Sequence, residues 1–86
     1  MLREIPYLHP GKILLEEFLK PMNITLSQLA KETGVAQSRI NDIVQGKRSI
    51  TTDVGVRLSR FFGTNDGFWI RLQIDYDTAQ VRDDDL

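Results

Sequence analysis

The stretch LSQLAKETGVAQSRINDIVQGK, residues 26–47, decides the fold of this 86-residue chain. In it Ala30 is followed at a distance of four by Gly34, and then come Ile40 and Ile43. The small Ala30 lets a second helix cross close above the first, and Gly34 supplies the positive φ of a sharp turn. The spacing is typical of a helix-turn-helix, although an ordinary pair of antiparallel helices can produce it by chance.

Helical signals continue before this stretch. In residues 11–20 apolar side chains repeat at intervals of four, which predicts a helix that Pro21 ends. Thr25 and Gln28 have the spacing of a capping box, in which each residue accepts a hydrogen bond from the other's backbone N–H. The helix that they open should end at Gly34.

The same signals continue after it. A third helix is predicted over roughly 37–45, a fourth from Thr51 to Gly63, and a fifth from Asn65 to about Gln80. Five short helices joined by short loops predict an all-α fold. No alternating run of the kind that predicts a strand interrupts them.

Length and composition limit the possible classes. The 86 residues leave room for one domain, 1–86, and there is no cysteine for a disulfide or a thiolate metal site. One histidine and no Ser-His-Asp set argue against an enzyme, so we expect neither cofactor nor metal. Neither a secretion signal nor an apolar run of ~20 residues is present, so we expect a cytoplasmic chain that spans no membrane.

Charge is unevenly distributed along the chain. The net charge of −1 counts mildly against a nucleic-acid binder. Residues 27–60 nevertheless hold six cationic and three anionic side chains, a local charge of +3, whereas residues 75–86 carry a local charge of −4. We expect an N-terminal arm over 1–9, a helix-turn-helix over 26–45 that overlaps the basic segment, and an acidic C-terminal tail over 78–86.

The outward face of the third helix is rich in amide, hydroxyl and guanidinium groups. A merely solvated helix face would more often carry Lys and Glu. Amides pair with adenine and guanidinium with guanine, so these are the groups that read base edges in the major groove. With Ile40, Ile43 and Val44 inward, the candidate base-reading residues are Gln37, Ser38, Arg39, Asn41 and Asp42.

Polar residues beyond this face suit contacts with DNA phosphates. Cationic and hydroxyl side chains follow Gly46, and the N-terminus of the preceding helix offers free N–H groups. For Lys47 and Arg48 the alternative is a solvated loop near a helix C-terminus. The candidate phosphate-binding residues are Ser27, Gln28, Gln45, Lys47, Arg48 and Ser49.

The fifth helix is apolar on two sides. One side repeats at i, i+3 and i+7 and the other at i and i+4, and a helix of this kind is buried on two sides. Because so short a chain has no obvious second partner for it, we expect a homodimer. The candidate interface residues are Trp69, Ile70, Leu72, Ile74 and Tyr76.

Both ends of the chain leave alternatives open. Ile5, Tyr7 and Leu8 of the N-terminal arm could cover the second apolar side within one chain. His9 is better placed to orient the start of the first helix than to act as a titrating group. The Asp83–Asp85 run resembles a metal site less than a set of solvated carboxylates at a chain end.

Four motifs occur in the order and spacing of a known family: HPGKILLEEFLKPM at 9–22, QGKRSIT at 45–51, RLSRFFGT at 57–64 and FWxxLQxxYD at 68–77. The chain resembles the HigA/VapI-type antitoxins, which are Xre/Cro-like helix-turn-helix proteins. This resemblance implies a lambda repressor-like fold and a dimer that binds double-stranded operator DNA. It also implies repression of the chain's own operon and neutralisation of a small ribonuclease toxin.

Two other functions remain open at this point. One is a stand-alone Xre-type regulator without a toxin, and the other is a protein-interaction module that no longer binds DNA. Two residues depart from the family pattern. Gly55 replaces the usual Ala, at a cost of about 1 kcal/mol in helix propensity unless close packing requires it. Ala36 replaces the common Ser or Thr N-cap of the third helix.

Overall fold

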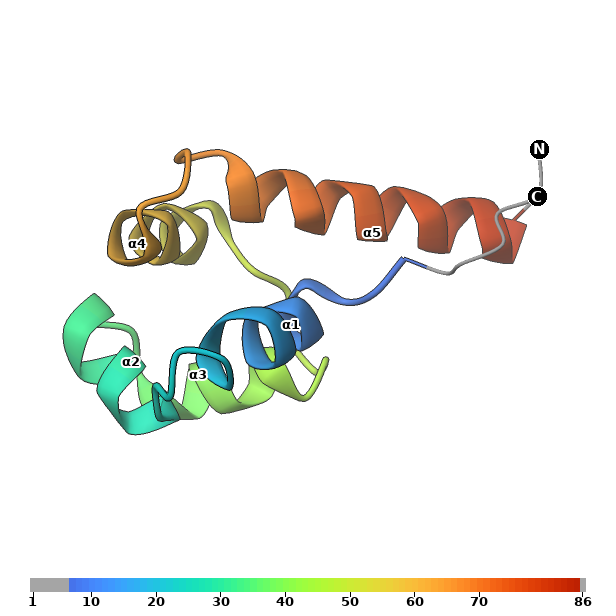
Figure 1. Cartoon of the computed structure of the whole chain (residues 1–86). Helices are drawn as coiled ribbons and strands as arrows, with labels where there is room; N and C mark the ends of the chain where they lie inside the picture. Colours follow the sequence, from blue (N-terminus) through green and yellow to red (C-terminus); the bar gives the residue numbers. More distant parts are fainter. Residues whose placement is uncertain (1–6, 86) are drawn as a thin grey trace.

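The computed structural model describes residues 7–85, with side chains as far as Asp83, and all regular structure in that range is helical (Figure 1). Because α1 and η1 form one continuous helix, the expected five-helix, all-α class is confirmed. The elements are α1 (Pro10–Ile13), η1 (Leu14–Leu19), α2 (Leu26–Thr33), α3 (Gln37–Val44), α4 (Thr52–Phe62) and α5 (Phe68–Asp85).

The first helix differs from the expected one in its winding. Residues 14–19 form a π-helix, and the backbone N–H of Lys20 donates to the carbonyl of Leu15, five residues back, at 3.0 Å. The wider turn places residues five apart on the same side of the helix. Leu14 and Leu19 therefore both face the core, each with 1% of its surface exposed.

The helix-turn-helix forms as its local signals predict. Thr25 Oγ1 accepts from the Gln28 N–H at 3.0 Å, and Gln28 Oε1 accepts from the Thr25 N–H at 2.8 Å, which confirms the capping box. Gly34 ends α2 with φ of 78°, and α3 begins three residues later. Gly46, which follows α3, is also left-handed, with φ of 76°.

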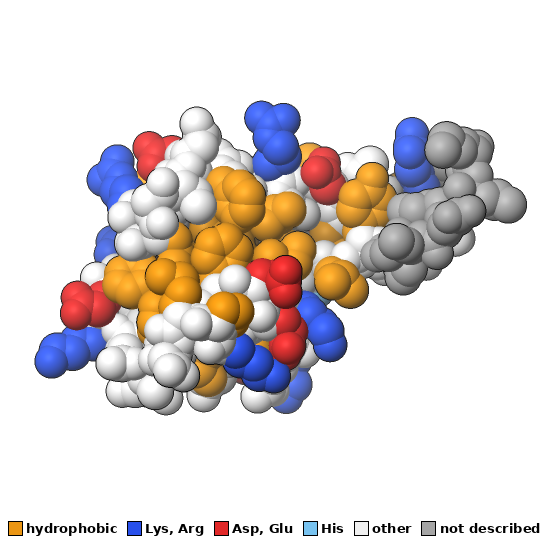
Figure 2. Space-filling view, viewed as in Figure 1, with side chains coloured by type: hydrophobic (Ala, Val, Ile, Leu, Met, Phe, Trp, Pro, Cys, Tyr) orange, Lys and Arg blue, Asp and Glu red, His pale blue; other side chains and the backbone are white. Residues whose placement is uncertain are grey.

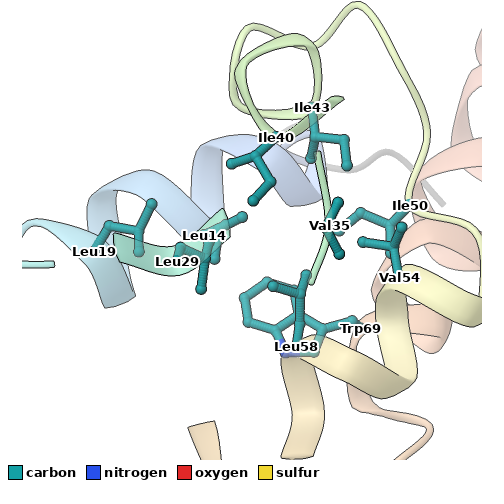
Figure 3. Close-up of a cluster of buried hydrophobic side chains, with 10 residues drawn as sticks. All are labelled: Leu14, Leu19, Leu29, Val35, Ile40, Ile43, Ile50, Val54, Leu58 and Trp69. Atoms are coloured by element: carbon teal, nitrogen blue, oxygen red, sulfur yellow. The ribbon is translucent and has the colours of Figure 1, made fainter. Parts of the chain in front are cut away.

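The core gathers side chains from η1, α2, α3, α4 and α5 and from the segments before α3 and α4 (Figure 3). Phe61 and Phe62 are half-buried at its edge. Ten apolar side chains form the centre: Leu14, Leu19, Leu29, Val35, Ile40, Ile43, Ile50, Val54, Leu58 and Trp69.

Helix α5 begins and ends later than predicted. Asn65 Oδ1 accepts from the Gly67 N–H at 2.9 Å, so it closes a turn before the helix instead of capping its first residue. At the other end, Ala79 is 2% exposed and no Gly or Pro follows it, so the helix continues to Asp85. With 18 residues α5 is about 27 Å long, and it runs out past the other helices of a molecule 41 Å in its longest dimension (Figure 1).

Among the helices in the described part of the chain, none is long and apolar enough to cross a membrane.

Candidate nucleic-acid interface

The turn between α2 and α3 is held by a residue of α4. Arg57 Nη1 donates to the Thr33 carbonyl at 2.9 Å, and Asp53 Oδ1 accepts from Arg57 Nε at 3.1 Å. Thr33 Oγ1 also accepts from the N–H of Val35 inside the turn. A side chain 24 residues away therefore fixes the last carbonyl of α2, where the turn begins. Sequence reasoning missed the role of Arg57 in the turn. The signal available was the spacing of Asp53 and Arg57, since an acidic and a basic residue four positions apart can pair on a helix.

The predicted base-reading residues do not share one environment. Gln37 and Ser38 are exposed near the start of α3, whereas Arg39, Asn41 and Asp42 are half-buried. Asn41 Oδ1 is shielded from solvent and has no hydrogen-bond partner among the described residues. In this conformation that oxygen cannot accept from a base, so the two-bond contact with adenine expected of Asn41 requires its side chain to rotate.

The start of α3 is open to an anion. Its N-cap is Ala36, which is exposed and makes no side-chain hydrogen bond to the helix. The first backbone N–H groups therefore keep their donor capacity, and the positive end of the helix dipole is not covered by a capping oxygen. Gln37 and Ser38 lie at this same end.

All six predicted phosphate-binding side chains are exposed. Gln28 uses its Oε1 in the capping box, which leaves its amide N–H groups as the donors it can offer. After α3, residues 45–49 form what we call the 45–49 loop. Within it, the Lys47 N–H donates to the Asp42 carbonyl at 2.8 Å, and the Arg48 guanidinium lies 3.8 Å from the Asp42 carboxylate. Lys47 and Arg48 thus extend from a loop whose backbone is tied to α3.

Comparison with known proteins identifies this arrangement. A family model described as helix-turn-helix matches residues 15–69, which contain α2, the turn, α3 and α4. The chain belongs to the helix-turn-helix family. The virulence-associated protein I of Dichelobacter nodosus is 46% identical over 81 residues, which cover 94% of this chain and 75% of that protein.

Two solved structures are also similar. One is an addiction module antidote protein of a HigA family from Coxiella burnetii, 39% identical with a TM-score of 0.86, where the match covers 93% of this chain and 87% of that one. The other is the Pseudomonas aeruginosa antitoxin HigA with the higBA promoter, 38% identical with a TM-score of 0.87, covering 91% and 85%. The resemblance to HigA/VapI-type antitoxins is thereby confirmed.

In this helix-turn-helix protein the start of α1 touches the end of α3. A Cβ atom on Gly11 would lie 1.7 Å from the Ile43 carbonyl oxygen, so only glycine permits this approach of the two backbones. His9 caps α1, since its Nδ1 accepts from the Gly11 N–H at 2.9 Å. Its ring meets Tyr76 of α5 edge-on, with centroids 5.0 Å apart. Burial lowers the pKa of His9, and the Asp77 carboxylate opposes that shift.

The candidate dimer residues divide between the core and the surface. Trp69 is 0% exposed and packs against Phe18 and Phe68, so its assignment to a dimer interface is corrected: it belongs to the core of its own chain. Leu72 and Tyr76 are half-buried on the same side of α5. This side docks the helix onto its own domain.

The other side of α5 remains apolar and exposed. Ile70 is half-buried, but Ile74 is 57% exposed and Val81, seven residues further, is 59% exposed. Val81 was missed because the helix was expected to end at Gln80. In Figure 2 hydrophobic side chains gather where the helices meet and recur further along α5. We call Ile70, Ile74 and Val81 the outer stripe of α5.

The described part of the N-terminal arm leaves this stripe uncovered. Tyr7 lies beside α5, at a hollow also lined by Asp75 and Arg82, yet Ile74 and Val81 keep more than half of their surface exposed. Leu8 is itself 50% exposed. Ile5, the third arm residue of the alternative in which the arm covers α5, lies outside the described residues.

Proposed function

We propose that the chain is a cytoplasmic antitoxin that binds operator DNA as a homodimer, represses its own operon and neutralises a small ribonuclease toxin. The observation that carries this proposal is the open N-terminal end of α3. It presents exposed Gln37 and Ser38 between two sets of exposed phosphate-binding candidates. A related antitoxin solved with its promoter supports the same use of the fold.

In the proposed complex, the start of α3 enters the major groove. Gln37, Ser38 and Arg39 contact base edges there, while Asn41 and Asp42 line the same face further along the helix. The six exposed phosphate-binding candidates hold the backbone on either side. Because the net charge is only −1, affinity depends on these local contacts and on two copies acting together.

The proposed homodimer forms through the outer stripe of α5. Ile70, Ile74 and Val81 lie on one side of the helix, and a second copy of this stripe is its natural complement in a two-fold arrangement. Two helix-turn-helix units on one rigid dimer can then reach half-sites about 34 Å apart.

The proposed toxin contact uses the acidic end of the chain. Residues 75–86 carry a local charge of −4, which suits the basic surface of a ribonuclease and also repels non-specific DNA. Purification from the native host tests this part. A small ribonuclease and the promoter fragment should both co-purify with the chain. Promoter without ribonuclease would instead indicate a stand-alone regulator, and ribonuclease without promoter an interaction module.

Salt dependence tests the DNA contacts. Lys47→Ala and Arg48→Ala should weaken binding to the promoter fragment and to unrelated DNA alike, and each should lower the slope of log affinity against log salt by about 0.9. The matched control is Arg71→Ala, which removes the same charge from an exposed position. Arg71 belongs to α5, and this helix lies on the opposite side of the molecule from α3 (Figure 1). An unchanged slope in the loop variants would show that Lys47 and Arg48 do not contact phosphates.

A further inference from the structure

We propose that Gln73 of α5 is a positioning residue for DNA binding, which holds the 45–49 loop by a buried hydrogen bond to the backbone of Ile50. The inference rests on the proposed function, in which Lys47, Arg48 and Ser49 of that loop contact phosphates. Gln73 belongs to the FWxxLQxxYD motif, and neither the core nor the proposed DNA-binding face accounts for it.

The amide of Gln73 is fixed at both of its ends. Its Oε1 accepts from the Ile50 N–H at 2.8 Å, and its Nε2 donates to Asp77 Oδ1 at 2.9 Å. An ionised carboxylate only accepts hydrogen bonds, so Asp77 must face the amide nitrogen, and the oxygen is then turned toward Ile50. Asp77, one turn along α5, thus sets the orientation in which Gln73 can hold the loop.

This bond is inaccessible to water. Gln73 is 5% exposed and Ile50 is 4% exposed, with the Ile50 side chain packed beside Val54 in the core (Figure 3). If the acceptor were lost, the buried N–H of Ile50 would have no solvent to replace it, and an unsatisfied donor is costly. The segment at Ile50 would then have to shift to reach water.

The 45–49 loop is held on both sides. On the α3 side, the N–H groups of Gly46 and Lys47 donate to the carbonyls of Ile43 and Asp42. On the α4 side, Ile50 is held by Gln73 across 23 residues of sequence. Arg48 and Ser49 lie between these two anchors. Releasing one anchor leaves more loop conformations to be lost when the side chains meet phosphates, so binding weakens.

The same helix carries the outer stripe. Ile74 directly follows Gln73, so the surface proposed for dimer contact and the anchor of the 45–49 loop are adjacent on α5. Because Gln73 holds the backbone of Ile50, the placement of Arg48 and Ser49 depends on where α5 packs on its own domain.

Two variants separate the hydrogen bond from packing. Gln73→Met keeps the length of the side chain and removes the amide. The double variant Gln73→Glu/Asp77→Asn keeps an acceptor for Ile50, and its asparagine amide replaces the Asp77 carboxylate, which would otherwise face a second carboxylate. Gln80→Met is the matched control, because it makes the same chemical change on an exposed site of the same helix. Thermal unfolding of each variant confirms that it is folded under the conditions of the other measurements.

Amide hydrogen exchange in the DNA-free protein tests the anchor itself. Gln73→Met should speed exchange at Ile50 by about tenfold or more, whereas Gln73→Glu/Asp77→Asn and Gln80→Met should keep that amide protected. Unchanged protection of Ile50 in Gln73→Met would overturn the proposal without any reference to DNA.

Affinity for the promoter fragment tests the consequence. Gln73→Met should weaken binding roughly threefold to tenfold in the otherwise unchanged chain. In a Lys47→Ala/Arg48→Ala background the same substitution should have less than about a twofold effect, since both cationic side chains of the loop are gone and only Ser49 remains to be positioned. Equal losses in both backgrounds would overturn the positioning role. If the Lys47→Ala/Arg48→Ala chain bound DNA as well as the original, the phosphate contacts of the proposed function would fail first, and this inference with them.

Discussion

At the scale of single residues, the contact of Gly11 with α3 is the least tolerant of change. A Cβ at this position would meet the backbone of Ile43, which cannot rotate away as a side chain can. We predict that Gly11→Ala lowers the free energy of unfolding by about 3 kcal/mol, measured by urea denaturation.

The control for Gly11 is another glycine with room around it. A Cβ on Gly67 would be 3.5 Å from its nearest neighbour, the Oδ1 of Asn65, which is an ordinary contact. Gly67→Ala should therefore change stability by no more than about 0.5 kcal/mol. If Gly11→Ala changed the free energy of unfolding as little as Gly67→Ala does, α1 and α3 would be able to move apart at little cost.

His9 makes the fold sensitive to mild acid. Because burial lowers the pKa of its imidazole in the folded chain, the unfolded chain takes up a proton first as the pH falls. The stability that depends on His9 is therefore complete above a pH of about 6.5 and decreases as the pH falls below it.

His9→Asn isolates this effect, because asparagine keeps an acceptor at the N-cap and does not titrate. Between about pH 7 and about pH 5, the free energy of unfolding should fall more steeply in the original chain than in the variant. Urea denaturation at several pH values measures both. Parallel curves would mean that protonation of His9 does not oppose folding.

Residue environments were predictable only where they are set locally. Thr25 and Gln28 form their capping box because both partners lie within one turn of helix. Asn41 is different: its position on α3 faces outward by periodicity, yet its oxygen is shielded. Shielding depends on neighbouring elements, which periodicity does not describe.

At the scale of elements, Gly55 explains how closely α4 and α5 pack. A Cβ on residue 55 would lie 2.8 Å from Cγ1 of Ile70, so the departure from the family's usual Ala accompanies a tight contact between these helices. Gly55→Ala gains about 1 kcal/mol of helix propensity but introduces overpacking of about 2 kcal/mol. We predict a net loss of stability of about 1 kcal/mol.

The sign of this effect should reverse when Ile70 is shortened. In an Ile70→Ala background the clashing atom is absent, so Gly55→Ala should then stabilise the chain by about 1 kcal/mol. Thermal or urea unfolding of the four chains completes the cycle. If Gly55→Ala lowered the free energy of unfolding in both backgrounds, a clash with the Ile70 side chain would not be the cause.

Most helix starts and turns followed their local signals more faithfully than the two ends of α5 did. Gly34 and Gly63 end α2 and α4 in the left-handed conformation, as predicted. The end of α5 lies about five residues beyond the predicted Gln80, because no capping residue marks it and because Ala79 is buried by the rest of the fold. The π-helical winding of η1 was missed for the same reason: it serves the packing of Leu14 and Leu19.

At the scale of the whole molecule, the outer stripe of α5 predicts a dimer. Sedimentation equilibrium at micromolar concentration should show a species of twice 9.9 kDa. The double variant Ile74→Glu/Val81→Glu should sediment as a monomer with unchanged helicity, because it places two charges where apolar surface would be buried. It should also bind promoter DNA more weakly, since one rigid unit no longer spans two half-sites.

Met22→Glu is the control for the dimer, because Met22 is 53% exposed but lies between η1 and α2, outside the outer stripe. It should leave the dimer intact. Only a 9.9 kDa species from the original chain would contradict the assignment of the outer stripe to an interface.

The sequence by itself determined the class of fold, the helix-turn-helix and most helix ends, because caps, glycines and prolines act on the backbone within a few residues. It also placed Lys47, Arg48 and the polar side chains of α3 together, since one helix and the loop after it bring them near each other. Only the tertiary structure decided that Trp69 lies in the core while Ile74 and Val81 lie outside. The bond from Gln73 to Ile50 likewise joins residues 23 apart. Burial and long-range hydrogen bonds depend on which distant elements pack together, and periodicity within one helix carries no information about that.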